Sequence, residues 1–258
     1  MTTTRLLRAS IAIMGFIFVL SGCAGFDRPR DTIFQVSTID ALSAGGYDGE
    51  TAVAELLRHG DLGIGTFVGL DGEMVVIDGV VYRAGADGVP GAVPPGTLTP
   101  FAVVTFFDHD RIVPVAGETT YPGLQKNIDD LLAGTRLFTA VRVHGTFDSV
   151  TFRSVPRQEK PYPTLAEALK GQTVFTLTDV SGTLVGFVCP PYVGGVNVPG
   201  WHLHFIADDR TAGGHLLSFT SHDLEVSLDE TDQFFMILPE AASPSVGPAV
   251  EKPGAGLE

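Results

Sequence analysis

The chain contains 258 residues, of which 44% are hydrophobic and 18% are charged, and its formal net charge is −14 at pH 7. Such an acidic composition argues against nucleic-acid binding and against a membrane contact made through basic patches. The 31 glycines and 17 prolines indicate a fold rich in turns and strands rather than in long helices. The length allows one large domain or two closely packed smaller ones.

The N-terminus has the features of an export signal. Arg5 and Arg8 precede an apolar run at residues 11–20, which is shorter than the ~20 residues needed to span a bilayer. Cys23 follows directly after Leu-Ser-Gly, a pattern that resembles the signal of bacterial lipoproteins. An ordinary signal peptide followed by an incidental cysteine is the alternative. We expect a signal peptide over residues 1–22 and a tether over residues 23–32.

Lipidation of Cys23 would define both location and redox chemistry. The mature protein would be exported and held by acyl chains on the periplasmic or extracellular face of a membrane. Cys189 is the only other cysteine, so no intramolecular disulfide is expected. We therefore expect Cys189 to be a small apolar core residue.

In chain order, the sequence first predicts a strand at residues 33–42 and then a helix at residues 50–59 that stops at Gly60. A series of strands follows, and Asp-Gly pairs at 71–72 and 78–79, which are typical of tight hairpins, separate its members. These strands are expected at residues 62–70, 73–77 and 80–84. Residues 85–100 are expected to form a loop.

Further along the chain, a strand is expected at residues 102–107 and a helix at residues 123–133. Residues 138–144 and 149–155 predict a hairpin around Gly145-Thr146. Residues 156–163 (PRQEKPYP) predict a linker, and residues 165–170 a short helix. The remaining strands are expected at residues 173–180, 182–188, 201–207, 215–220 and 224–228.

These elements predict an α/β (α+β) fold made of two packed halves, each a mixed, mostly antiparallel β-sheet with a few short helices. We place an N-terminal mixed-sheet domain at residues 33–156 and a β-rich, metal-binding domain at residues 157–240. Residues 241–258 are mostly Ala, Pro, Gly, Ser and Glu and predict a low-complexity tail.

A histidine motif is the strongest local signal for chemistry. In the run Trp-His-Leu-His-Phe at residues 201–205, His202 and His204 point to the same face of a strand because side chains two apart share a face. A turn-like stretch at residues 208–214 would return the chain and bring His215 beside them. Three neutral imidazoles with an open fourth position are typical of catalytic zinc.

The alternative interpretation of these histidines is that each is an ordinary core or surface residue. The pair at i and i+2, with a third across a tight turn, favours the metal site. The other histidines lack such partners, and we interpret each as structural or exposed; they are His59, His109, His144 and His222.

Several segments together resemble the α-acetolactate decarboxylase family. They are GDLGIGTF at 60–67, LDGEMV at 70–75, DGVVY at 78–82, FRSVPRQEKPY at 152–162, WHLHF at 201–205 and GGH at 213–215. The resemblance runs in order from about residue 32 to residue 238 without a large gap. Each segment alone is a weak signal, but the combination is specific.

The resemblance implies a zinc enzyme that removes CO₂ from 2-acetolactate, a small anionic substrate, and releases acetoin. It also implies a two-domain α/β fold and a homodimer. The implied zinc ligands are His202, His204 and His215, and the implied active-site residues are Glu73, Arg153 and Thr66. A glutamate near the C-terminus of the family also reaches the site; Glu251 is the candidate here, although the surrounding sequence has drifted.

These residue types suit the reaction. Decarboxylation of a β-keto acid leaves an electron pair that must flow onto the ketone oxygen, and a metal that polarises the ketone stabilises the resulting enediolate. Glu73 can supply or relay the proton, and Arg153 can hold the carboxylate through two parallel hydrogen bonds. Without the resemblance, Glu73 would be interpreted as a solvated charge and Thr66 as an ordinary strand residue, whereas Arg153 could equally be a surface charge or a functional residue.

Two other functions remain open from the sequence. One is a non-catalytic, zinc-containing binding or sensor protein of the same fold, which the presence of all the implied site residues disfavours. The other is an extracytoplasmic zinc hydrolase, but the chain contains no H-E-x-x-H helix to supply its general base.

Overall fold

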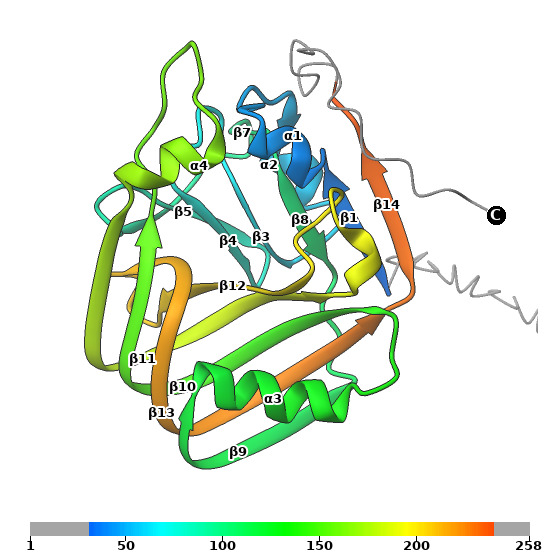
Figure 1. Ribbon diagram of the computed structural model, residues 1–258, viewed down its shortest axis with the longest axis vertical. Helices are drawn as coiled ribbons and strands as arrows, with labels where there is room; N and C mark the ends of the chain where they lie inside the picture. The colour runs from blue at the N-terminus through cyan, green and yellow to red at the C-terminus, as the bar shows by residue number, and fades with distance from the viewer. Residues whose placement is uncertain (1–30, 240–258) are drawn as a thin grey trace, which may run out of the picture.

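The computed structural model describes residues 31–239, which form two β-sheets packed against each other (Figure 1). The seven-stranded sheet has the order β14-β1-β8-β3-β4-β5-β6. Neighbouring strands within this sheet are antiparallel, except for β1 and β14, which are parallel to each other. Its strands are β1 (Thr32–Val36), β3 (Leu62–Thr66), β4 (Glu73–Ile77), β5 (Val80–Ala84), β6 (Pro90–Ala92), β8 (Ala102–Thr105) and β14 (Gln233–Ile237).

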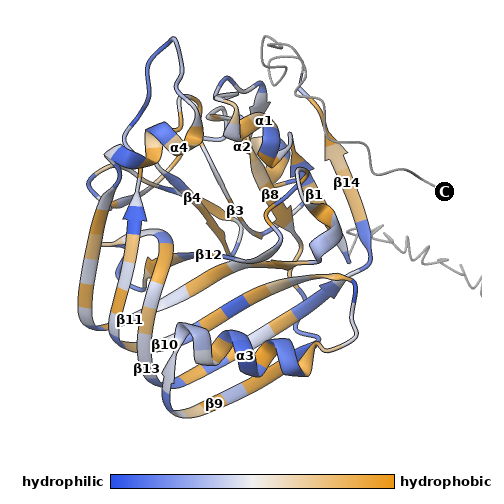
Figure 2. Ribbon diagram, viewed as in Figure 1, coloured by the Kyte–Doolittle hydropathy of each residue, from blue (hydrophilic) through white to orange (hydrophobic). Residues whose placement is uncertain are grey.

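The second sheet contains five longer antiparallel strands in the order β10-β11-β12-β13-β9. Strand β10 also pairs with β13, so the strands from β10 to β13 form a closed ring. Figure 2 shows hydrophobic and hydrophilic residues alternating along these long strands, as expected for strands with two different faces. They are β9 (Arg111–Thr120), β10 (Phe138–Ser154), β11 (Thr173–Cys189), β12 (Gly200–Ala207) and β13 (Gly213–Thr231).

Short helices cover the sheets. Helix α3 packs on the five-stranded sheet through Leu124 and Ile128, and the Thr120 hydroxyl caps its first turn by accepting from Gly123 N. The Thr38 side chain caps α1 in the same way by accepting from Ala41 N. The helices are α1 (Ile39–Ser43), α2 (Val53–Leu56), α3 (Tyr121–Leu131), α4 (Leu165–Ala168) and the 3₁₀ turns η1 (Leu169–Gly171) and η2 (Pro191–Val193); β2 (Thr51–Ala52) and β7 (Leu98–Thr99) form a small ribbon.

The main core lies between the two sheets. Strand β4 is buried along its whole length, with Val75 contributing to this core. Ile206 of β12 packs into the same cluster from the opposite sheet. A second cluster, which includes Leu203 and Phe205, lies on the other face of β12. The alternation along β12 therefore directs even-numbered residues toward the seven-stranded sheet.

The predicted fold class is confirmed, and so are the two Asp-Gly hairpins, since β3 pairs with β4 and β4 with β5. Residues 156–163 lack regular structure, as expected, and Cys189 is buried in the core. No helix among residues 31–239 is long and apolar enough to cross a membrane. The signal, Cys23, most of the tether and the low-complexity tail lie outside the described residues.

Several element boundaries were predicted wrongly. The strand expected at residues 33–42 ends at Val36, and α1 follows because Thr38 caps a new helix. The helix expected at residues 50–59 is reduced to α2, since Thr51 pairs with Thr99 instead. The loop expected at residues 85–100 contains β6 and β7, and strands β9 and β14 were not predicted.

The hairpin expected around Gly145-Thr146 does not form. Strand β10 continues through these residues because β11 and β13 pair with it on both sides. A Cβ atom at Gly145 would lie 2.5 Å from the carbonyl oxygen of Asp223, so this glycine permits a close approach of strands rather than a turn. For the same reason the strand pairs expected at 173–188 and at 215–228 are the single strands β11 and β13.

The sheets do not divide at residue 156, where the sequence placed a domain boundary. Strands β9 and β10 precede that position and belong to the five-stranded sheet. Strand β14 follows it and joins the seven-stranded sheet beside β1. The two layers therefore exchange strands, which brings side chains from both halves of the chain to their common face.

Candidate active site

Strands β12 and β13 bring the three predicted histidines together. His204 is the direct cross-strand partner of His215, and His202 lies two residues before His204 on the same face. The ring centroids are 5.0 to 5.3 Å apart, and one ligand atom from each ring lies within 4.8 Å of the others. The geometry expected from the spacing is confirmed.

Glycine makes this close packing possible. A Cβ atom at Gly214 would lie 2.4 Å from the carbonyl oxygen of Arg153, and one at Gly186 would lie 2.0 Å from that of His202. Any other residue at these positions would push β13 away from β10, or β11 away from β12. The glycine before His215 therefore supports the site through strand contact.

The hydrogen bond of His204 defines its tautomer and tests whether the site fits a metal. Its Nδ1 lies 2.8 Å from the carbonyl oxygen of Met74 in β4. Because a carbonyl only accepts, Nδ1 carries the proton and donates, which leaves Nε2 with a free lone pair. That Nε2 is buried and has no hydrogen-bond partner. A buried, unpaired nitrogen facing two further imidazoles fits a metal ion with nitrogen ligands.

The imidazoles are neutral at physiological pH. Burial lowers the pKa of His202 to about 4, assisted by the positive charge of Arg153. Burial also holds the pKa of His204 and of His215 well below the ordinary value, with His202 contributing next. A metal ion requires the neutral form of its histidine ligands, so these shifts favour binding.

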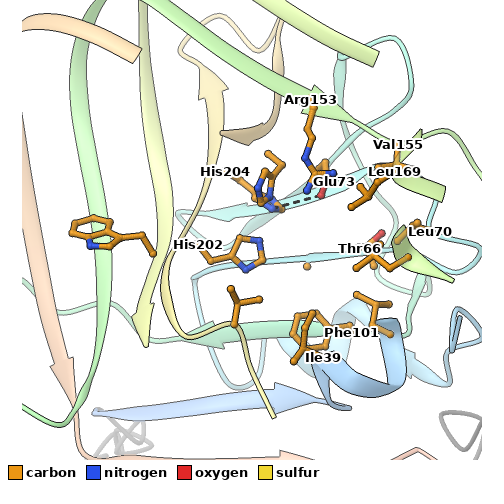
Figure 3. Close-up of a pocket in the computed structure, with 16 residues that line it drawn as sticks. Ile39, Thr66, Leu70, Glu73, Phe101, Arg153, Val155, Leu169, His202 and His204 are labelled. Atoms are coloured by element: carbon orange, nitrogen blue, oxygen red, sulfur yellow. Dashed lines mark ion pairs between the residues drawn. The ribbon is translucent and has the colours of Figure 1, made fainter. Parts of the chain in front are cut away.

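Glu73 and Arg153 approach the histidines from two different sheets (Figure 3). Glu73 begins β4 and is only 9% exposed, although it directly follows a hairpin turn. Its Oε1 lies 3.9 Å from Arg153 Nη1 and its Oε2 lies 3.6 Å from His204 Nε2. Arg153 is the cross-strand partner of His215 on β10. The interpretation of these two residues as solvated charges is therefore excluded.

Burial dominates the ionisation of this pair. It raises the pKa of the Glu73 carboxyl to about 7, against the opposing effect of the Arg153 charge. Burial also lowers the pKa of Arg153, against the opposing charge of Glu73. The pair therefore combines a carboxyl that holds a proton easily with a partly desolvated cation.

Thr66 lies opposite Glu73 on β3 and lines the same cavity. Its hydroxyl donates to the carbonyl oxygen of Gly72 at 2.7 Å, which leaves the oxygen lone pairs able to accept. Glu251 lies outside the described residues.

All these side chains line one cavity of about 290 Å³ between the sheets. Its polar groups gather on one side, and apolar side chains form the rest of the wall. This apolar wall was not predicted, because its members look like ordinary core residues in the sequence. It consists of Ile39, Leu42, Leu70, Phe101, Val155, Leu165, Leu169, Val198 and Trp201.

The fold and the site together define a class of protein: two packed sheets that enclose a cavity with a three-histidine, metal-type centre and a buried Glu–Arg pair. The model of the alpha-acetolactate decarboxylase family matches residues 33–244. The chain is 50% identical to the alpha-acetolactate decarboxylase of Methanosarcina mazei over 213 residues, which cover 83% of this chain and 74% of that protein. It is 40% identical to the alpha-acetolactate decarboxylase of Bacillus subtilis over 216 residues, which cover 84% of this chain and 85% of that protein.

Solved structures agree with the sequence relatives. The crystal structure of alpha-acetolactate decarboxylase from Bacillus subtilis strain 168 superimposes with a TM-score of 0.79 at 40% identity, covering 81% of this chain and 89% of that one. The crystal structure of a Staphylococcus aureus protein of unknown function, similar to the same enzyme, superimposes with a TM-score of 0.78 at 31% identity. The match covers 80% of this chain and 89% of that one. The chain belongs to the alpha-acetolactate decarboxylase family, and it is accordingly an enzyme of the carboxy-lyase class.

Proposed function

We propose that this enzyme decarboxylates 2-acetolactate to acetoin and CO₂ with a zinc ion held by His202, His204 and His215. The observation that carries the proposal is the free, buried Nε2 of His204 facing two neutral imidazoles beside the Glu73–Arg153 pair. When bound, zinc would act as a Lewis acid on the ketone oxygen of the substrate. Three neutral ligands would leave the ion its full positive charge, which attracts an anionic substrate to an acidic protein.

Arg153 is the group we assign to the substrate carboxylate. Its guanidinium lines the cavity and is largely shielded from solvent by burial. A planar guanidinium can hold a carboxylate through two parallel hydrogen bonds, and such bonds strengthen in a site that excludes water. Arg153 would thereby orient the bond to the departing CO₂ toward the apolar part of the cavity.

Glu73 is the group we assign to the proton. Loss of CO₂ leaves a carbon that must be protonated from one face, which requires an acid in a fixed position. The Glu73 carboxyl lies at the junction of Arg153 and His204, so it faces both the carboxylate site and the metal-type centre. Burial favours its protonated form, whereas Arg153 and a bound cation favour the carboxylate, so the group can give and regain a proton.

Thr66 and the apolar wall would complete the site. The Thr66 oxygen can accept a hydrogen bond from the substrate hydroxyl, since its own proton is donated to Gly72. Apolar side chains such as Phe101 and Val155 would pack against the methyl groups and exclude water. We propose that Glu251 reaches the site from the C-terminal tail, as the family resemblance implies.

We also propose that the enzyme acts outside the cytoplasm as a membrane-anchored lipoprotein and as a homodimer. The first proposal is supported by the Leu-Ser-Gly-Cys run that ends at Cys23, and the second by the family resemblance. Labelled palmitate should enter the wild-type protein in a bacterial host and should not enter Cys23→Ser. No incorporation in the wild type would contradict the anchor, and a monomeric mass in solution would contradict the dimer.

A direct assay tests the proposed reaction. Purified protein supplied with racemic acetolactate should form acetoin, and metal analysis of the same preparation should find one zinc per chain. A zinc-replete, folded protein that forms no acetoin would support the non-catalytic alternative instead.

A further inference from the structure

Two buried amides hydrogen-bond to each other next to Val198, a residue that lines the active cavity. Gln35 lies on β1, and Asn197 lies in the 190–199 segment that leads into β12. Asn197 Nδ2 donates to Gln35 Oε1 at 2.8 Å. Their exposed fractions are 0% and 2%. Burial of a polar side chain costs free energy unless its groups are paired, so the other polar groups of these two amides also need partners.

The remaining polar groups of the pair bind the backbone of neighbouring segments. Gln35 Nε2 donates to the carbonyl oxygens of Ser37 and Val196, both at 2.7 Å. Asn197 Oδ1 accepts from Val198 N at 2.6 Å. Two of these hydrogen bonds, from Gln35 Nε2 to Val196 O and from Asn197 Nδ2 to Gln35 Oε1, connect the end of β1 to the 190–199 segment. The other two lie within β1 and its end and within the segment, and they orient the two amides.

The connected segments supply two residues of the apolar wall. Ile39, at the start of α1, and Val198 both line the cavity that contains His202. Figure 3 shows Ile39 and His202 in this cavity. Ile39 N also donates to the carbonyl oxygen of Val196 at 3.0 Å. Part of the apolar wall is thus built on the backbone that Gln35 and Asn197 hold.

Packing fixes the 190–199 segment only in part, since Val193 joins the main core whereas Tyr192 is exposed. A second cavity of about 280 Å³ lies beside the segment, lined in part by Tyr192, Val193, Val196 and Phe234. With open space on that side, the hydrogen bonds help to hold the segment in place together with the packing of Val193.

We infer that Gln35 and Asn197 are positioning residues that set the place of Ile39 and Val198 relative to the histidines, and thereby the size of the alkyl group that the cavity accepts. This inference rests on the proposed function, because the groups in question are the alkyl substituents of an acetolactate-type substrate. It adds a determinant of substrate size that lies outside the metal-type centre and the Glu73–Arg153 pair.

The decisive variant is Asn197→Asp in the zinc-loaded enzyme. It keeps the shape of the side chain but places an oxygen against Gln35 Oε1, and no rotation of the Gln35 amide then pairs every group. Displacement of the segment lowers the fraction of competent enzyme, so KM for acetolactate should rise about tenfold, whereas kcat at saturating substrate should change less. Amide hydrogen exchange in residues 190–199 should become faster.

Three further variants complete the test. Asn197→Ser removes the same contact with a smaller change and should act in the same direction if Asn197→Asp does not fold.

Val198→Ala keeps the amide pair but shortens the side chain in the cavity wall, so kcat/KM should shift toward the substrate homologue that carries ethyl in place of methyl. Asn127→Asp changes an exposed amide on α3 and should leave KM, selectivity and exchange unchanged.

The outcomes separate this inference from the proposed function. Unchanged KM and exchange in both Asn197 variants, in a preparation whose wild type forms acetoin, would overturn the inference. So would loss of zinc with a proportional loss of kcat at constant KM, since that result would assign Asn197 to support of the metal centre. Absence of acetoin from the wild type would instead overturn the proposed function.

Discussion

Glu73 and Asp229 are two buried carboxyls whose pKa burial raises to about 7, but their surroundings differ. Glu73 opens onto the cavity and faces Arg153 and His204. Asp229 accepts from Asp108 N at 3.1 Å, its Oδ1 has no hydrogen-bond partner, and its charged neighbours are acidic. Burial alone therefore produces a carboxyl with a raised pKa, whereas a chemical role also requires a cation, a cavity and a reacting partner.

The largest effect should come from removing a histidine of the metal-type centre. His204→Ala deletes the free Nε2 together with the hydrogen bond to Met74, so we expect both zinc and acetoin production to fall to background. His222→Ala is the matched control. His222 also lies in the sheet, on β13, but its side chain is exposed and paired with Asp148. Loss of activity at full zinc occupancy in His204→Ala would indicate a different ligand set.

The next effect tests the comparison of the two carboxyls. Glu73→Gln keeps the size of the side chain but removes its titratable proton, so turnover should fall roughly 10²–10⁴-fold at unchanged zinc content. Asp229→Asn makes the same change at the other carboxyl and should leave turnover near the wild-type value. Equal losses in the two variants would contradict the assignment of Glu73 as the acid, and zinc loss in Glu73→Gln would make it a support of the metal centre.

A smaller effect is expected from Arg153→Lys. The substitution keeps a positive charge but removes the planar donor that can bind a carboxylate with two hydrogen bonds, so kcat/KM should fall roughly 10- to 100-fold. Arg142→Lys, on the same strand but paired with the exposed Asp78, serves as the control and should behave like the wild type. Steady-state kinetics on zinc-replete preparations would decide, and a wild-type rate for Arg153→Lys would remove the carboxylate role.

The last effect concerns stability and leaves activity unchanged. Because the folded-state pKa of Asp229 is raised to about 7, the folded protein holds a proton that the unfolded chain has lost between about pH 4 and pH 7, so the wild type loses stability as pH rises through this window. The free energy of unfolding of Asp229→Asn should therefore gain on that of the wild type from about pH 4 to pH 7, by on the order of 4 kcal/mol, and the difference should stay constant above pH 7. Denaturant unfolding at several pH values would show it, and a pH-independent difference would contradict the assigned cause.

Local spacing predicted part of the site and of the fold. The i, i+2 spacing of His202 and His204 and the turn before His215 describe one hairpin, so residues close in sequence form the metal-type centre. The Asp-Gly pairs likewise describe turns between neighbouring strands. Such features are visible because alternation and turn chemistry act over only a few residues.

Other features arise only when distant strands meet. Glu73 follows a turn and looks solvated in the sequence, yet β12 packs over it through the His204–Met74 hydrogen bond. Gly145 looks like a hairpin turn, yet it is required by the approach of Asp223 from β13. Ile39 and Val198 look like ordinary core residues, and only the packed sheets place them in the cavity wall. The resemblance to a family, rather than residue spacing, drew attention to Glu73 and Arg153.

Zinc titration into the metal-free enzyme tests the central claim most directly. Acetoin production from racemic acetolactate should be absent without metal, rise in proportion to added zinc and reach its maximum at one zinc per chain, because one three-histidine centre lies among the described residues. Full acetoin production by the metal-free protein, or none at full zinc occupancy, would contradict the assignment of this site as a zinc-dependent acetolactate decarboxylase.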